Sequence, residues 1–270
     1  EDIKRRIMNQ DRDVQNLEKR FAELSRTAYQ RDIITYSDFL NLNEQNILHM
    51  LPKDRLFTRI VSFGGYEMAE RQMAAFIPDA LYLRYGKKEL EPEEVGYPFC
   101  ALEITPVNLK FADTLTHRDY LGAVLNLGIE RSRIGDILPD EKGALLFVHN
   151  DIADFICSEL SRIRHTSVKV NPVSLTDVSY SPKVEEIRGT VASVRLDSLL
   201  ALAFSQSRSR LTGLIAGAKV YVNGRLITSN GYQPETGDVI SVRGMGKFRY
   251  EYAGGRTRKN RVNVVISKYV

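Results

Sequence analysis

The sequence predicts an α+β protein made of three consecutive parts. Residues 1–50 are charged, contain no Gly or Pro, and carry apolar residues at helical spacing. The middle of the chain alternates short apolar runs with helical patterns, and the last third combines two short helical patterns with a hairpin signal. We therefore expect a helical N-terminal region at residues 1–54, a central α+β domain at 55–180, and a small C-terminal module with a basic extension at 188–270.

The N-terminal region is expected to be mainly helical. Its apolar positions are Leu17, Phe21, Leu24, Phe39, Leu40, Ile47 and Leu48. A Pro-containing segment at 51–54 closes this region. The run 56–63 then reads as a strand that ends at Gly64-Gly65.

The central domain is expected to mix strands and helices. Strands are predicted at 99–104, 144–148 and 167–173, and helices at 117–127 and 152–163. Thr116 and Asp119 have the spacing of a capping box at the start of the first helix. The stretch 171–182, with two prolines, reads as a linker.

The C-terminal module is expected to contain two short helices followed by a β-hairpin. Ser193 and Ser207 are placed to cap the helices, whose inner faces would be formed by Leu196, Leu199, Leu200 and Ala203, and by Leu211, Leu214 and Ile215. Asn223-Gly224 lies between two strand-like runs, which is a strong signal for a tight hairpin. A further strand is predicted at 237–242.

Charge is distributed unevenly along the chain. Residues 188–270 contain 14 Lys and Arg against 4 Asp and Glu, whereas residues 1–187 contain 24 against 30. A basic segment of this kind favours a polyanionic partner, because each neutralised phosphate releases a counterion. Arginines near a capped helix start add fixed donors to the helix N–H groups, which suits phosphate oxygens.

Residues 188–246 resemble the S-four RNA-binding domain with its αL motif. The resemblance rests on Arg195-Leu196-Asp197, Ser207-Arg208, Gly217-Ala218-Lys219-Val220, Val222-Asn223-Gly224 and Gly237-Asp238-Val239-Ile240. It implies an RNA-binding face that includes Arg195, Ser207, Arg208, Arg210 and Lys219. We extend the candidate face to Asn223, Arg225, Arg243, Lys247 and Arg249. The alternative is a solvated basic surface without a ligand.

Beyond residue 246 the sequence extends the positive surface. Basic residues continue through Arg256, Arg258, Lys259 and Arg261, and the aromatic residues Phe248, Tyr250 and Tyr252 stand among them. Such a pattern could bind phosphates and stack on bases. The aromatic residues at period two could equally form the buried face of a terminal strand.

Nearly the whole chain resembles the YlmH-like family of bacterial ribosome-associated proteins. The matching segments are Ser37-Asp38-Phe39-Leu40, Gly64-Gly65-Tyr66 with Ala69-Glu70-Arg71, and the run from His117 through Gly122, Leu127-Gly128-Ile129 and Arg131 to Gly135-Asp136-Ile137. Leu42-Asn43 departs from the family, whose members often carry Pro there.

The family resemblance implies a factor that acts without chemistry of its own. It would bind ribosomal RNA, transfer RNA or both on the large ribosomal subunit, in quality control of stalled nascent chains. His117, Arg118, Arg131 and Arg133 become candidates for a second RNA surface. For Arg131 and Arg133 the alternative is ordinary solvated charge after a helix.

Two other function classes remain as alternatives. Arg195-Leu196-Asp197 matches the catalytic triplet of pseudouridine synthases, but Asp197 lies in the first turn of a small helical module, and too few residues follow it for a catalytic domain. A protein–protein adaptor that uses the acidic N-terminal region is the other alternative. A kinase reading of His117-Arg118-Asp119 fails, because Val124 stands where an Asn is required.

No cofactor or metal motif is found, and we expect neither. Cys100 and Cys157 lack the spacing of a zinc site and are expected in the core. We further expect a cytoplasmic protein that is monomeric when free and does not engage a membrane.

Overall fold

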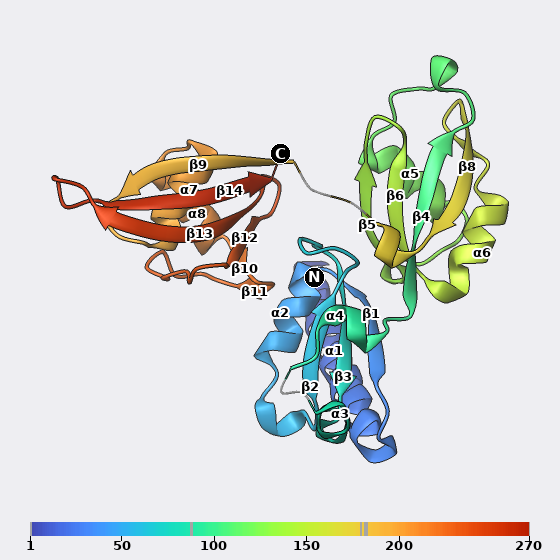
Figure 1. Cartoon of the computed structure of the whole chain (residues 1–270). Helices are drawn as coiled ribbons and strands as arrows, with labels where there is room; N and C mark the ends of the chain where they lie inside the picture. Colours follow the sequence, from blue (N-terminus) through green and yellow to red (C-terminus); the bar gives the residue numbers. More distant parts are fainter. Residues whose placement is uncertain (1, 87–88, 179, 181–182, 270) are drawn as a thin grey trace. The chain divides into compact units, whose positions relative to one another are not determined.

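The computed structural model describes residues 2–86, 89–178, 180 and 183–269. The chain divides into two compact units, residues 1–180 and 181–270 (Figure 1). Each unit combines helices with antiparallel strands, so the expected α+β class is confirmed. Among the described residues, no helix is both long and apolar enough to cross a membrane.

The first layer of unit 1 is a three-stranded sheet covered by two helices. The sheet has the order β1-β3-β2, and its elements are α1 (Asp2–Arg31), β1 (Thr35–Leu40), α2 (Leu42–Met50), β2 (Arg59–Phe63) and β3 (Gln72–Ile77). Phe21 of α1 and Leu48 of α2 pack on Phe76 of β3. The capping box of Asn41 and Glu44 starts α2. A 3₁₀ turn (Lys53–Arg55) precedes β2.

The N-terminal region is mainly helical as predicted, but strand β1 interrupts it between α1 and α2. Its neighbouring residues Phe39 and Leu40 enter different cores on the two faces of the sheet. Because both faces of the strand are buried, apolar residues stand next to each other instead of alternating with polar ones. Two adjacent apolar residues also fit a helical pattern. Strand β1 pairs with β3, so this sheet joins residues from both sides of position 54, where the sequence suggested a first boundary.

The second layer of unit 1 is a five-stranded antiparallel sheet with the order β5-β6-β4-β8-β7. Its strands are β4 (Phe99–Pro106), β5 (Ile134–Pro139), β6 (Ala144–His149), β7 (Arg162–Ile163) and β8 (Thr166–Val173). Helices α5 (His117–Leu125) and α6 (Asn150–Glu159) cover one face. Short helices α3 (Asp79–Tyr85) and α4 (Pro92–Val95), and 3₁₀ turns Leu109–Phe111, Arg131–Arg133 and Leu175–Asp177, complete the unit.

The two sheets of unit 1 share a core. The ring centroids of Phe39 in β1 and Phe99 in β4 lie 5.1 Å apart, and Phe147 of β6 belongs to the same cluster. The predicted strands and helices of this region are present with shifted ends. The expected helix 152–163 ends earlier, and its last residues form β7 instead.

Unit 2 is a six-stranded antiparallel sheet with two helices packed on one face. The order is β11-β10-β12-β13-β14-β9, and the elements are β9 (Val184–Val191), α7 (Leu196–Phe204), α8 (Arg208–Ala216), β10 (Val220–Val222), β11 (Arg225–Leu226), β12 (Val239–Val242), β13 (Gly246–Arg256) and β14 (Val262–Tyr269). The helices bury Leu199, Leu211 and Ile215 against the sheet, whereas Leu214 is only partly buried. Strand β9 pairs with β14 along its whole length.

Several local predictions for unit 2 can be compared with the structure. Asn223 and Gly224 both have positive φ and form the expected hairpin turn. Ser207 caps α8 as predicted, because its Oγ accepts a hydrogen bond from the Arg210 N–H at 3.4 Å. The prediction that Ser193 caps α7 is wrong. The N-cap is Arg195, and the Leu196 N–H donates to the Tyr232 carbonyl at 2.8 Å.

The aromatic residues of β13 differ from one another in burial. Phe248 and Tyr250 lie in the core, whereas Tyr252 is 48% exposed, because the register shifts between Tyr250 and Tyr252.

The two cysteines were expected in the core. Cys100 and Cys157 are instead half-buried and pack against the edge of the unit 1 core.

Candidate RNA-binding surfaces

Four of the predicted RNA-contacting residues stand at the starts of the two helices of unit 2. Arg195 is the N-cap of α7, Ser207 is the N-cap of α8, and Arg208 and Arg210 occupy the first turn of α8. Ser207 and Arg210 are exposed, and Arg210 donates from Nη1 to Gln206 Oε1 at 3.1 Å. The side chain of Arg208 lies outside the described part of the structure. The start of α8 therefore combines basic side chains with helix N–H groups, which is a suitable arrangement for phosphate. At α7 the first turn is buried, so Arg195 contributes its side chain alone.

Arg195 is fixed by an ion pair with Asp197. The Arg195 Nε lies 3.3 Å from Asp197 Oδ1, and Nη2 donates to Oδ2 at 3.4 Å. Asp197 is only 8% exposed and also accepts from the Ser198 hydroxyl at 3.4 Å, whereas the Arg195 side chain is 42% exposed. The carboxylate thus orients a guanidinium whose other side faces solvent.

A second group of predicted residues lies at the edge formed by β10, β11 and β12. The Arg243 N–H donates to the Lys219 carbonyl at 2.9 Å, which places these two exposed basic residues side by side. Arg225 is exposed on the edge strand β11. Asn223 has a structural role, because its side chain donates to Asp238 at 2.7 Å and accepts from the Val239 N–H at 2.9 Å.

Lys247 and Arg249 lie on a different face. They alternate along β13 with the buried Phe248 and Tyr250, so their side chains leave the sheet on the side opposite the helices. Both are half-buried, and the Lys247 Nζ lies 5.8 Å from the ring centroid of Tyr269. The fold therefore places Lys247 and Arg249 on the face of the sheet opposite the two helices that carry Arg195, Ser207 and Arg210.

The proposed second surface in unit 1 also divides into two kinds of residue. His117 and Arg118 are exposed at the start of α5. Partial burial and the nearby charge of Arg131 lower the pKa of His117, so its imidazole is neutral at neutral pH. Arg131 donates to the carbonyls of Ile134 and Gly135, and burial together with the charge of Arg71 lowers the pKa of Arg131 to about 10.

Arg133 is also engaged within the chain. Its guanidinium pairs with Asp38 at 3.0 Å and with Asp151. Arg131 and Arg133 are therefore held by neighbouring groups of unit 1, unlike the plain solvated charges that the sequence left as an alternative. Of the four residues of the proposed second RNA surface, His117 and Arg118 are therefore the ones more accessible to RNA.

Asp136 organises the loop that carries much of the family resemblance. Its Oδ2 accepts from the Tyr66 hydroxyl at 2.8 Å and the Glu70 N–H at 2.7 Å, and Oδ1 accepts from the Arg71 N–H at 3.1 Å. The buried Arg71 side chain donates in turn to the carbonyls of Ile134, Phe39 and Arg131. Sequence reasoning found these residues by resemblance but did not identify this contact network.

The close packing around this network explains one glycine of the motif. Gly65 has a φ of 99°, and a Cβ placed there would lie 2.2 Å from the ring of Phe147. No other residue fits this position without displacing the aromatic core. The Gly64-Gly65-Tyr66 segment is thus explained by the scaffold and requires no ligand.

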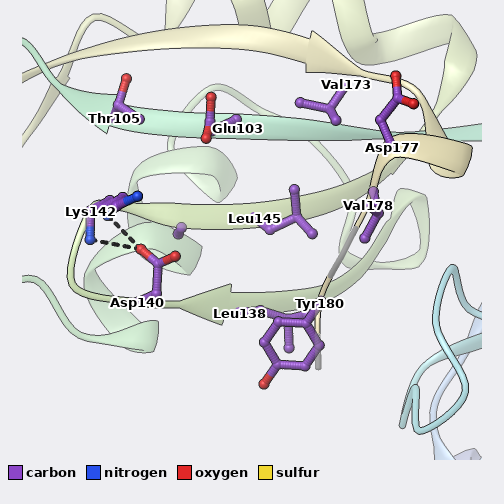
Figure 2. A pocket seen from close by; sticks show the side chains of 12 residues that line it. Glu103, Thr105, Leu138, Asp140, Lys142, Leu145, Val173, Asp177, Val178 and Tyr180 are labelled. Carbon is purple, nitrogen blue, oxygen red and sulfur yellow. Dashed lines mark hydrogen bonds between the residues drawn. The ribbon is translucent and has the colours of Figure 1, made fainter. Parts of the chain in front are cut away.

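A pocket of about 200 Å³ lies over the face of the five-stranded sheet that α5 and α6 do not cover (Figure 2). Glu103 and Thr105 of β4, Asp140 before β6 and Asp177 line it together with Lys142. The N–H groups of Lys142 and Gly143 both donate to Asp140 Oδ1 at 2.8 Å. Three carboxylates repel phosphate, so this pocket is not the RNA site. Among the described residues, no group of His, Cys, Asp and Glu is arranged to hold a metal ion.

Two protein families match the chain in separate segments. Residues 92–177 match the "Putative RNA-binding domain in YlmH", and residues 194–240 match the "S4 domain". The first segment contains α5 and the five-stranded sheet, and the second contains α7, α8 and the hairpin. Both predicted RNA surfaces fall within these matches, except for the β13 residues and Arg243.

The chain is also similar to individual proteins. It is 29% identical over 250 residues to the "Ribosome-associated protein quality control protein P2" of Bacillus subtilis (strain 168), covering 91% of each chain. A solved structure, the "Cell division protein ylmH from Streptococcus pneumoniae", matches with a TM-score of 0.47 and 24% identity over 63% of this chain and 94% of that chain. The predicted resemblance is confirmed: the chain contains a segment that matches the YlmH putative RNA-binding domain, followed by a segment that matches the S4 domain.

Proposed function

We propose that the chain is a non-catalytic RNA-binding factor that acts on the large ribosomal subunit. It would bind ribosomal RNA, transfer RNA or both during quality control of stalled nascent chains. The relative from Bacillus subtilis carries the words ribosome-associated and quality control in its name, which supports this placement. A cytoplasmic location and a monomeric free state belong to the same proposal.

One observation carries the proposal furthest. Within the S4 segment, the starts of the two helices carry Arg195 and the exposed Arg210, and Lys219 adds a further exposed charge. Donors fixed in this way suit the phosphates of folded RNA, which proteins recognise largely by shape. Such phosphate contacts position a protein on RNA without reading its bases.

The test compares two double variants that lose the same charge. Arg210→Ala with Lys219→Ala removes two exposed members of the proposed surface, whereas Lys183→Ala with Arg188→Ala removes two exposed basic residues outside it. Arg188 is a suitable control because Glu186 already pairs with it at 2.7 Å. Binding to purified large ribosomal subunits and to total transfer RNA is measured for both. We expect the first pair to lose about tenfold or more in affinity and the control to remain near wild type.

The pseudouridine-synthase alternative is tested at Asp197. The contacts of Asp197 with Arg195 and Ser198 at the start of α7 support a structural role. Unmodified ribosomal RNA is incubated with the wild type and with Asp197→Asn, and modified uridines are mapped. We expect no modification by either protein. Modification that disappears in the variant would establish an enzyme instead.

A protein–protein adaptor is a second candidate, favoured by one exposed apolar group. Val107, Leu109 and Phe111 are 69%, 63% and 82% exposed on the segment that follows β4. Contiguous exposed apolar side chains mark interaction sites. Pull-downs from ribonuclease-treated extracts, with Phe111→Ser as the comparison, separate this role from RNA binding.

A further inference from the structure

The β13–β14 hairpin extends beyond the rest of unit 2 (Figure 1). The sequence suggested a basic tail here, but the structure forms two paired strands joined by a turn. The six residues at 256–261 include four basic ones, Arg256, Arg258, Lys259 and Arg261, and no acidic residue. This tip lies outside the segment that matches the S4 domain.

Hydrogen bonds fix the shape of the turn. The Asn260 N–H donates to the Thr257 carbonyl at 2.8 Å, and the Thr257 N–H donates to the Arg261 carbonyl at 2.8 Å. Asn260 has a φ of 58°, as in hairpin loops where a turn is followed by a left-handed residue. Arg258 and Lys259 therefore occupy the two central positions of the turn and are exposed.

Two of the four basic residues hold the tip, and two remain available. Arg256 donates from Nη1 to Asn260 Oδ1 at 2.9 Å. Arg261 donates from Nε to Thr190 Oγ1 at 3.0 Å and also to the Thr190 carbonyl, which ties the tip to β9. No hydrogen bond or ion pair joins Arg258 or Lys259 to another of the described residues. An ordered backbone lowers the entropy that binding would cost.

We propose that this tip is a second RNA contact of unit 2, in which Arg258 and Lys259 bind phosphates of a structured RNA. The inference rests on the proposed RNA-binding function and adds a site that lies beyond the helix starts. Gly254 and Gly255 precede the tip and are exposed, so a nucleic acid backbone could approach the strand closely there. The tip carries no large apolar side chain of the kind that anchors protein interfaces, so charge favours RNA over a protein partner.

The test measures how the affinity of the intact chain for RNA depends on salt. The variant Arg258→Ala with Lys259→Ala is compared with wild type and with the charge-matched control Lys183→Ala with Arg188→Ala. The probes are a 20-base-pair double-stranded RNA, total transfer RNA and purified large ribosomal subunits. If the tip contacts two phosphates, the slope of log K against log salt becomes less negative by about 1.4 to 1.8. The control should keep the wild-type slope on every probe.

The other possible results of this experiment each reject a different part of the proposal. An unchanged slope in the tip variant, with RNA binding intact, rejects the tip contact and leaves the proposed function standing. A loss seen only on large subunits, and on neither free RNA, confines the contact to the ribosome. The same comparison on protein-free ribosomal RNA then supports an RNA contact if the loss persists there, and replaces it with a protein contact if it does not. If the wild type binds none of the three probes, the proposed function fails and the tip contact fails with it. Circular dichroism of both variants, which change only exposed side chains, verifies that they are folded.

Discussion

At the scale of single residues, this protein uses several polar and charged side chains to hold its own fold. Asp136 orders the 64–71 loop, Asn223 fastens the hairpin turn to β12, and Arg195 and Asp197 pair at a helix start. The resemblance identified all of these positions without distinguishing scaffold from surface. That distinction depends on burial and on partners distant in sequence, which a pattern of residue types does not contain.

The first prediction separates the two roles of Arg195. Arg195→Ala should weaken binding to large subunits and also destabilise unit 2 by about 1 kcal/mol, because the nearly buried Asp197 loses its partner. Adding Asp197→Asn should restore part of the stability, since a neutral amide is easier to bury, while the affinity stays low. Chemical denaturation and subunit binding are measured on both variants. Recovery of affinity together with stability would show that Arg195 acts only through the fold.

The second prediction concerns Asp136. Asp136→Asn turns one accepting oxygen into a donor that faces N–H or O–H groups, so unit 1 should lose about 1–3 kcal/mol of unfolding free energy. Asp54→Asn, at an exposed position, serves as the control and should change stability by less than about 0.5 kcal/mol. Equal stabilities in urea denaturation would remove the case for Asp136 as an organising residue.

At the scale of elements, sequence patterns located strands and helices well where one face is buried. The capping box at Thr116, the cap at Ser207 and the Asn223-Gly224 turn follow from local chemistry, and each is present in the structure. The sequence did not reveal β1, whose two faces enter different cores, and it offered a terminal strand at 248–252 as one of two interpretations without showing that it pairs in the β13–β14 hairpin. In the latter, Gly254 and Gly255 interrupt the alternation that marks a strand, and the partner strand begins only after the basic turn.

A third prediction follows from the inner faces of α7 and α8. Leu211 is fully buried, so Leu211→Ala should cost about 2–5 kcal/mol through the cavity that it leaves. Leu214 is partly buried, and Leu214→Ala should cost less than Leu211→Ala. Urea denaturation of the two variants gives the order directly. The reverse order would mean that α8 is rotated relative to the structure described.

A fourth prediction concerns pH. Hydrogen bonds from the Thr116 backbone and hydroxyl hold the pKa of Asp119 below its ordinary value of 3.8. A lowered carboxyl pKa means that the stabilisation is present above the unfolded pKa and is lost as pH falls through the folded pKa. Thr116→Val keeps the backbone donor but removes the hydroxyl, so NMR titration should show a pKa of Asp119 closer to the ordinary value. An unchanged pKa would assign the whole effect to the backbone donor.

At the scale of the whole molecule, the two units separate an acidic part of the chain from a basic one. Length and the charge split predicted several parts, and the structure shows that α1, β1 and the central sheet share one compact unit. Sequence alone could not show this sharing, because contacts such as Phe39 with Phe99 join residues sixty positions apart.

A fifth prediction uses this division. A fragment of residues 183–270 contains a complete sheet and its own core, so it should unfold cooperatively and bind structured RNA by itself. If it contacts about five phosphates, log K against log salt should have a slope between roughly −3.5 and −4.5. Residues 1–180 should bind the same RNA more weakly, as their acidic composition suggests. An affinity of residues 183–270 that ignores salt would contradict an electrostatic contact.

The pairing of β9 with β14 joins the first strand of unit 2 to its last, across more than seventy residues. During synthesis the helices and the first hairpin emerge early, but β9 has no partner until residues 262–269 have left the exit tunnel. The six-stranded sheet is therefore complete only when β14 is available, and until then β9, which stays at the rim of the finished sheet, also lacks a partner along its inner edge. A nascent chain that stops shortly before residue 262 would carry this unpaired edge, and would depend on its own ribosome or on a chaperone to keep it from aggregating.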